Sequence, residues 1–104
     1  MAFGKLELQG LEATLKTCGQ KFGFQILAIL MSTRTGKGFN DLLREISDIS
    51  PRTLSLRLKE LEAKRLVSKN ISMGPRVKIE YRITDRGLQF EKALEEMARA
   101  GSKL

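Results

Sequence analysis

A single stretch of the sequence decides the fold: Ile49-Ser50-Pro51-Arg52-Thr53-Leu54-Ser55-Leu56-Arg57-Leu58-Lys59-Glu60-Leu61. Ser50 is a residue type that caps the N-terminus of a helix, and Pro51 suits the first helical position because an N–H has no intrahelical partner there. Three leucines then recur at i, i+4 and i+7 and share one face of a helix. They are Leu54, Leu58 and Leu61. The pattern predicts a helix over residues 50–65 with a basic C-terminal end, which suits the helix dipole.

Three helices are predicted before this stretch. The first covers residues 6–18, where leucines recur at nearly helical spacing, and Gly19 is placed where a C′ glycine ends a helix. The second, over residues 21–31, is apolar almost all round, as a helix buried at the centre of a small domain is. A polar, glycine-bearing connection over residues 32–38 leads to a short third helix over residues 40–46, and a tight turn separates it from Ser50.

After the decisive stretch the apolar period changes from helical to two. Residues 67–73 and residues 77–83 each alternate as a strand does, and the turn Gly74-Pro75 between them predicts a hairpin. Alternation of apolar and charged residues predicts that the second strand is half-buried, with one face toward the core. Thr84 is a suitable N-cap for a last helix over residues 85–100.

Two short helices joined by a tight turn and followed by a basic hairpin are typical of a winged helix-turn-helix. The fold class predicted is α+β, mostly α, with a two-stranded wing and flanking N- and C-terminal helices. A chain of 104 residues fits a single domain, so residues 1–104 are predicted to form one winged-helix DNA-binding domain.

The charge of the chain is concentrated in its middle. The sequence has 19 Lys+Arg against 12 Asp+Glu, a net charge of +7. Residues 34–82 hold twelve Lys/Arg against six Asp/Glu and therefore +6 of that excess. A clustered basic segment is typical of a protein that binds a polyanion, although a merely solvated surface would carry the same charge.

Composition also argues against several classes of function. The chain has no His, the commonest general base, and its single Cys cannot form a zinc knuckle or an intramolecular disulfide. We therefore expect no enzyme, no catalytic residue, no metal site and no cofactor. The most apolar stretch, Phe22 to Met31, is about half as long as a membrane span, so no membrane partner is expected. The location expected is the cytoplasm, in association with the nucleoid.

The predicted DNA contacts lie on the 50–65 helix, in the major groove, and on the 67–83 wing, on the backbone or in the minor groove. Arg52 is predicted to read a base, because a bidentate Arg–guanine contact is the commonest specific one. Its alternative is a solvated side chain. Leu56 either contacts a thymine methyl or packs on a neighbouring element, whereas Arg57 and Lys59 are predicted phosphate contacts. The full predicted set is Arg34, Lys37, Ser50, Pro51, Arg52, Thr53, Ser55, Leu56, Arg57, Lys59, Arg76 and Lys78. For the wing cations, the alternative role is to block unwanted strand pairing.

A second apolar stripe marks the last helix. Its residues fall at i, i+3, i+4 and i+7 and are predicted to bury against a second copy of the chain, together with leucines of the first helix. These dimer contacts are Phe90, Ala93, Leu94, Met97, Leu8, Leu11 and Leu15. Residues 1–20 and 85–104 would then contribute to dimerisation and set two recognition helices about 34–36 Å apart. The alternative is packing of the last helix onto the first within one chain.

Four segments of the sequence resemble one family. They are Phe39-Asn40-Asp41-Leu42-Leu43, Ile49-Ser50-Pro51-Arg52-Thr53-Leu54, Leu58-Lys59-Glu60-Leu61-Glu62 and Glu80-Tyr81-Arg82-Ile83-Thr84-Asp85-Arg86-Gly87. Together they resemble the HxlR-type branch of the MarR-like winged-helix regulators, over roughly residues 21–95. The resemblance implies a homodimeric DNA-binding transcription regulator with dimer contacts from the first and last helices.

Two departures from that family matter. Members often carry a Cys-Pro near the N-terminus, used by some as a redox sensor, and this chain has none. Members also tend to have Trp where this chain has Phe22 after Lys21. Cys18 lies within the helical period and is predicted to be a small buried residue, so redox sensing is not implied.

The leading hypothesis is a sequence-specific double-stranded DNA-binding transcription regulator that acts as a homodimer. Two alternatives stay open, a winged-helix protein-interaction module of a larger assembly and a nonspecific chromatin-like DNA binder. A small-molecule effector is compatible with the layout, but no residue pattern identifies one.

Overall fold

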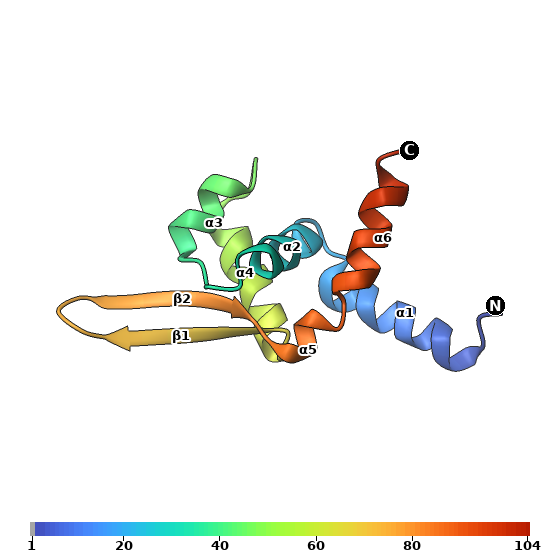
Figure 1. Cartoon of the computed structure of the whole chain (residues 1–104), viewed down its shortest axis with the longest axis horizontal. Helices are drawn as coiled ribbons and strands as arrows, with labels where there is room; N and C mark the ends of the chain where they lie inside the picture. Colours follow the sequence, from blue (N-terminus) through green and yellow to red (C-terminus); the bar gives the residue numbers. More distant parts are fainter. Residues whose placement is uncertain (1) are drawn as a thin grey trace.

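A computed structural model describes residues 2–104 and has a mostly helical winged helix-turn-helix fold (Figure 1). The elements in chain order are α1 (Lys5–Cys18), α2 (Gly23–Thr33), α3 (Phe39–Glu45), α4 (Pro51–Ala63), β1 (Val67–Met73), β2 (Val77–Ile83), α5 (Asp85–Leu88) and α6 (Glu91–Gly101). The molecule measures 55 × 27 × 23 Å, with the hairpin at one end and α1 at the other. The predicted fold class is confirmed.

Helix α4 begins as its sequence predicts. The Ser50 hydroxyl accepts a hydrogen bond from the Thr53 N–H at 3.1 Å, and Pro51 is the first helical residue. The leucine face of α4 is fully buried, and it consists of Leu54, Leu58 and Leu61. The helix ends at Ala63, because Arg65 adopts a left-handed φ of 60° that turns the chain into β1.

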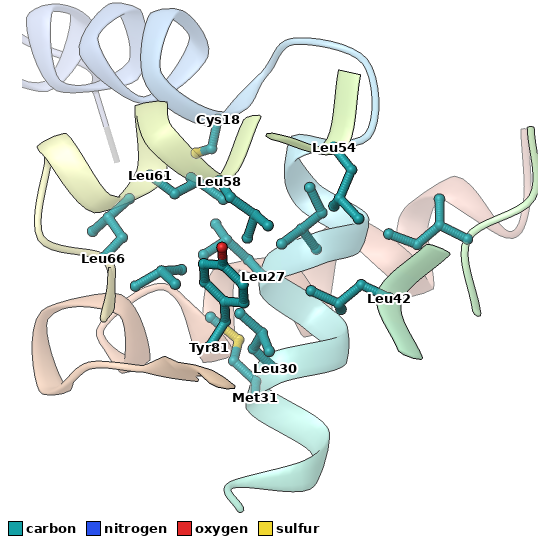
Figure 2. Packing of buried hydrophobic residues seen from close by; sticks show 13 residues of the cluster. Cys18, Leu27, Leu30, Met31, Leu42, Leu54, Leu58, Leu61, Leu66 and Tyr81 are labelled. Atoms are coloured by element: carbon teal, nitrogen blue, oxygen red, sulfur yellow. The ribbon is translucent and has the colours of Figure 1, made fainter. Parts of the chain in front are cut away.

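The core is built around α2, which lies at the centre of the domain (Figure 1). Ile26, Leu27 and Leu30 are fully buried, and the α4 leucines and Leu42 of α3 pack against them. Figure 2 shows the Tyr81 ring from β2 pointing into this cluster beside Leu27 and Leu30. The recognition helix, α3 and the base of the hairpin are therefore held by one shared core.

The start of α2 differs from the prediction. It begins at Gly23 and not at Lys21, because Phe22 adopts a left-handed φ of 77° and is the N-cap. A Cβ on Gly23 would lie 2.3 Å from the Cys18 carbonyl oxygen, so only glycine fits this close approach of α2 to the end of α1. The predicted stop at Gly19 is confirmed, and Gly19 is the C-cap of α1 with a right-handed φ of −82°.

The wing is an antiparallel hairpin whose register runs from Val67↔Ile83 to Met73↔Val77. A short bridge adds to its base, because Lys37 and Tyr81 exchange two backbone hydrogen bonds of 2.9 and 2.8 Å. Only the base is buried. The prediction of a half-buried strand is wrong for the outer part of the hairpin, where one face carries four exposed apolar side chains and Met73 is 81% exposed. They are Ile71, Met73, Val77 and Ile79.

The last predicted helix is two helices, α5 and α6, interrupted at Gln89 and Phe90. The N-cap at Thr84 is confirmed, because its hydroxyl accepts from the Gly87 N–H at 3.0 Å. The same hydroxyl lies 2.6 Å from the Arg65 carbonyl oxygen, to which it donates. Thr84 thus fastens α5 to the corner between α4 and β1.

Helix α6 lies against α2. Phe90 and Leu94 are half-buried against the core, and Arg34 at the end of α2 forms an ion pair with Glu91 at the start of α6. The alternative has the last helix packing onto the first within one chain, whereas the main neighbour of α6 is α2. Helix α1 instead projects from the domain at the opposite end from the wing (Figure 1).

Candidate nucleic-acid interface

The outer face of α4 presents three side chains to solvent. Arg52, Leu56 and Lys59 are exposed, on the side of the helix opposite the buried leucines. These outward positions are the ones the sequence predicts. Arg52 and Lys59 form no ion pair with any residue in the described range 2–104. Both charges are therefore available to an external partner.

The N-terminal end of α4 is held by its cap. Besides accepting from the Thr53 N–H, the Ser50 hydroxyl lies 3.0 Å from the Thr53 hydroxyl. Pro51 is exposed, whereas Thr53 and Ser55 are half-buried on the flanks of the helix. The cap fixes the first turn, so Arg52 projects from a rigid helix end and not from a frayed one.

Arg57 lies in a different environment from Arg52. Its Nε donates to the Lys21 carbonyl oxygen at 3.0 Å, its Nη1 donates to Glu60 at 2.8 Å, and its side chain is only 16% exposed. Arg57 therefore ties α4 to the linker between α1 and α2. This placement argues against the predicted phosphate contact, because the guanidinium already has partners inside the chain.

Two more of the predicted cations are also paired within the chain. Lys37 forms a 2.7 Å ion pair with Glu45 and is mostly buried beside the wing base. Arg34 reaches both Glu91 carboxylate oxygens, at 3.1 and 3.2 Å. Neither presents a free charge as Arg52 does, and sequence reasoning missed these pairings because the partners Glu45 and Glu91 belong to other elements.

The wing tip is exposed and basic. Arg76 lies in the turn and forms no ion pair with a residue in the described part of the chain. Lys78 and Arg82 each lie 3.7 Å from Glu80, a long separation for an ion pair. Exposed ion pairs of this kind contribute little to stability in water, so the cations are held only weakly by Glu80 and the tip retains a positive charge.

The turn between α3 and α4 sets the angle of the recognition helix. Asp48 there has a left-handed φ of 65°. Asp tolerates this conformation better than most residues, and the tight turn predicted before Ser50 is found here.

The residues predicted for dimerisation divide into two groups. Leu8, Leu11 and Leu15 on α1 are all exposed, as are Ala93 and Met97 on α6. Phe90 and Leu94 instead face the core of their own chain. Sequence reasoning missed Leu6 and Phe3, which are also exposed near the start of the chain, Leu6 at 77%.

Among residues 2–104 no group of three His, Cys, Asp or Glu side chains is placed to hold a metal ion. Cys18 is buried as predicted, and its Sγ donates to the Thr14 carbonyl oxygen at 3.2 Å. Burial raises the pKa of the Cys18 thiol, which keeps it protonated. Within the same residues, no helix has the length and apolar character needed to span a bilayer.

Three known proteins are similar to this chain in sequence or in structure. The HTH-type transcriptional regulator BH0655 of Halalkalibacterium halodurans is 36% identical over 90 residues, which cover 86% of this chain and 79% of that protein. The redox regulator HypR in its reduced form superposes with a TM-score of 0.82 at 29% identity, covering 90% of this chain and 91% of that one. The reduced form of the transcriptional regulator YodB from Bacillus subtilis superposes with a TM-score of 0.78 at 28% identity, covering 86% of each chain.

The family comparison covers most of the chain. The model of the HxlR-like helix-turn-helix family matches residues 17–104, which include the α3–α4 pair, the wing and the last two helices. The chain therefore belongs to the HxlR-like helix-turn-helix family and is a DNA-binding transcription regulator with a winged helix fold of the MarR type.

Proposed function

We propose that the chain binds double-stranded DNA sequence-specifically as a homodimer, with α4 in the major groove and the wing on the backbone or in the minor groove. The observation that carries the proposal is the solvent-exposed row of Arg52, Leu56 and Lys59 on a helix whose opposite face is fully buried. A helix fixed in this way can enter a major groove without unfolding its own core.

Each residue of the row has a distinct role. Arg52, in the first turn, reads a guanine through its two-pronged guanidinium. Lys59 neutralises a phosphate, and Leu56 contacts the methyl group of a thymine. Ser55 and Thr53 border the row, while Ser50 and Pro51 hold the helix end near the backbone. Arg76 and Lys78 contact the backbone beside the minor groove.

The paired cations act indirectly. Arg57, Lys37 and Arg34 hold α4, the wing base and α6 in place through their partners Lys21, Glu45 and Glu91. We assign these three a positioning role, because each would have to leave a partner in its own chain to reach a phosphate.

Dimerisation through α1 and α6 follows from exposed apolar surface. Leu8, Leu11 and Leu15 lie on one side of a helix that projects from the domain, and a second copy is the simplest partner able to cover them. Met97 and Ala93 on α6 are exposed as well. Two-fold pairing brings two recognition helices to successive major grooves on one side of the duplex. Such a regulator works in the cytoplasm on nucleoid DNA.

Regulation by thiol oxidation is not part of this proposal. HypR is a redox regulator by its description, whereas the single cysteine of this chain is buried and its pKa is raised. A reactive thiol needs thiolate character and access, and Cys18 lacks both.

The test is an anisotropy titration on a duplex obtained by in-vitro selection, repeated on a scrambled duplex. Arg52→Ala is expected to cost about 1–3 kcal/mol on the selected duplex and much less on the scrambled one. Affinity on both duplexes is expected to fall as salt rises, because binding releases counterions.

The matched control is Arg99→Ala, which removes the same charge from α6. Equal affinity for selected and scrambled duplexes would indicate a nonspecific binder. Absence of duplex binding, with retention of a protein complex, would indicate an interaction module.

A further inference from the structure

One face of the wing carries four apolar side chains that the described residues 2–104 leave exposed. They form two neighbouring columns, because the hairpin register pairs Ile71 with Ile79 and Met73 with Val77. Their exposed fractions range from 39% for Ile79 to 81% for Met73. We propose that this apolar face packs against the deoxyribose edges that line the minor groove of DNA. The contact rests on the proposed function, in which the wing lies beside the duplex.

The apolar face continues the buried face of the hairpin base. Val67 and Tyr81 point to the same side of the sheet as Ile71, because alternate residues of a strand, and residues paired across it, share a face. The core covers this side at the base, whereas the outer part of the hairpin extends beyond the helices (Figure 1). A contiguous exposed apolar patch is typical of a binding surface, since its exposure to water is unfavourable.

The charge around the apolar face indicates a polyanionic partner. Residues 67–83 hold four Lys/Arg and one acid, Glu80, a net charge of +3. Lys69 lies on the apolar face itself, next to Ile71 on the side of the base, and Arg76 lies in the turn. Neither cation forms an ion pair with a residue in the described part of the chain. The partner therefore offers apolar surface beside negative charge, as the edges of a DNA groove do, where sugars lie next to phosphates.

The size of the apolar face argues against a second copy of the chain as its partner. A patch of four side chains covers a few hundred Å² at most, whereas a stable interface buries about 800 Å² on each partner. Two facing wings would also bring cations of the same sign together, which is unfavourable. DNA needs no such area from the wing, because α4 supplies another part of the proposed interface.

The spacing of the two columns fits the sugars on either side of a minor groove. Cross-strand neighbours lie about 5 Å apart, and the groove is about 6 Å wide. A two-stranded hairpin with its side chains is too broad to enter such a groove, so it lies across the edges. Ile71 and Met73 then contact the sugars of one DNA strand, while Val77 and Ile79 contact those of the other.

The chemistry of the groove floor excludes the bases as the partner of this face. Base edges in the minor groove display hydrogen-bonding groups, mainly acceptors, and an apolar side chain covering them would leave them unpaired. Sugars are the same at every base pair. The apolar contact therefore adds affinity that depends on neither base sequence nor salt, whereas the wing cations add affinity that falls as salt rises.

The test is the double variant Ile71→Thr, Val77→Thr, which removes apolar surface from both columns and keeps the charge and the strand propensity. We expect its affinity to fall about fivefold to tenfold on both the selected and the scrambled duplex, with an unchanged salt slope. Arg76→Gln, in contrast, is expected to reduce that slope by about one. The matched control is Asn70→Thr, Ser72→Thr, on the opposite face of the same exposed strand, which leaves affinity unchanged.

Hydroxyl-radical footprinting locates the contact, because these radicals cleave DNA by abstracting sugar hydrogens that are exposed at the minor-groove edge. At saturating concentration the unaltered protein is expected to protect sugars on both strands of the minor groove beside the major groove that α4 occupies. The double variant is expected to lose this protection and to keep the protection elsewhere in the site. Urea unfolding of each variant reports whether it is folded.

Three results would overturn the proposal. Unchanged affinity and an unchanged footprint would favour a protein partner for the apolar face, and a reduced salt slope in the double variant would make the loss electrostatic. Dissociation of the double variant in sedimentation without DNA would assign the face to a second copy. The proposed sequence specificity fails separately, when Arg52→Ala weakens binding to both duplexes equally, because the sugar contact is measured on either duplex.

Discussion

Replacing Arg57 by alanine separates a structural role for this residue from a role in DNA binding. The side chain is mostly buried and bonds the Lys21 carbonyl oxygen at 3.0 Å and Glu60 at 2.8 Å. We expect Arg57→Ala to lower the stability of the fold while leaving the affinity of the folded protein for DNA almost unchanged.

The magnitude follows from these two contacts. A charged hydrogen bond to a carbonyl contributes about 1–2 kcal/mol net, and the partly exposed pair with Glu60 adds about 0.5 kcal/mol after solvent screening. The total loss is about 2 kcal/mol. For a domain of this size the urea dependence is about 1–1.5 kcal/mol per molar, so the midpoint of unfolding falls by roughly 1.5 M.

The assay is urea unfolding followed by circular dichroism at one fixed protein concentration, paired with anisotropy on the selected duplex. Lys59→Ala is the matched control, because Lys59 lies on the same helix but is exposed and unpaired. It is expected to leave the free energy of unfolding unchanged within about 0.5 kcal/mol and to weaken binding to every duplex. If Arg57→Ala weakens DNA binding about tenfold at an unchanged midpoint, Arg57 is a phosphate contact and the reasoning fails.

Three further predictions concern the ends of the domain. Gly87→Ala is expected to lower the free energy of unfolding by about 2–4 kcal/mol, measured in thermal or urea unfolding, because the new Cβ meets the Leu66 backbone. The control is Gly10→Ala, which places a Cβ in open space on α1. Equal stability of the two variants contradicts the prediction. Leu11→Glu is expected to raise the dimer dissociation constant by at least about tenfold in sedimentation experiments. The control is Gln9→Glu, which lies outside the face formed by Leu8, Leu11 and Leu15 and is expected to leave the constant unchanged. If the dimer survives Leu11→Glu, this face is not the dimer interface. Burial raises the pKa of the Cys18 thiol, so protonation is favoured in the folded state and the contribution of this group to stability declines as pH rises past the ordinary thiol value. The thiol of the folded protein is accordingly expected to react with a disulfide reagent at pH 8 far more slowly than in urea, and equal rates would refute its protection.

The sequence predicts an element of the fold correctly where a local pattern of residues also determines which side chains are buried. The Ser50-Pro51 start and the leucine period of α4 act within a few residues, so the sequence sufficed to predict both. The hairpin follows in the same way from alternation about Gly74-Pro75. The break between α5 and α6 could not be predicted from the sequence, because neither Gln89 nor Phe90 is a helix-breaking residue. The interruption lies where the chain turns so that α6 packs on α2.

The same distinction applies to the candidate site. The exposure of Arg52, Leu56 and Lys59 follows from helical periodicity. The pairing of Arg57 with the Lys21 carbonyl does not, because it depends on a linker 36 residues away in sequence. Likewise, the exposed outer half of the wing reflects how far the hairpin extends beyond the helices, which alternation alone does not reveal (Figure 1).

The wing is attached to the core at its base, where Val67 and Tyr81 are buried and Lys37 bridges to Tyr81, so its outer part extends beyond the core as a lever. About five residues separate Tyr81 from the turn, a length of about 16 Å at the rise of a β-strand. A rotation of about 10° at the base therefore moves the tip by about 3 Å, half the width of a minor groove. Helix α4 is packed along its whole length and has no such amplification. A small adjustment of the core around Tyr81 is therefore enough to shift Arg76 relative to the phosphate contact proposed for it while α4 stays in place.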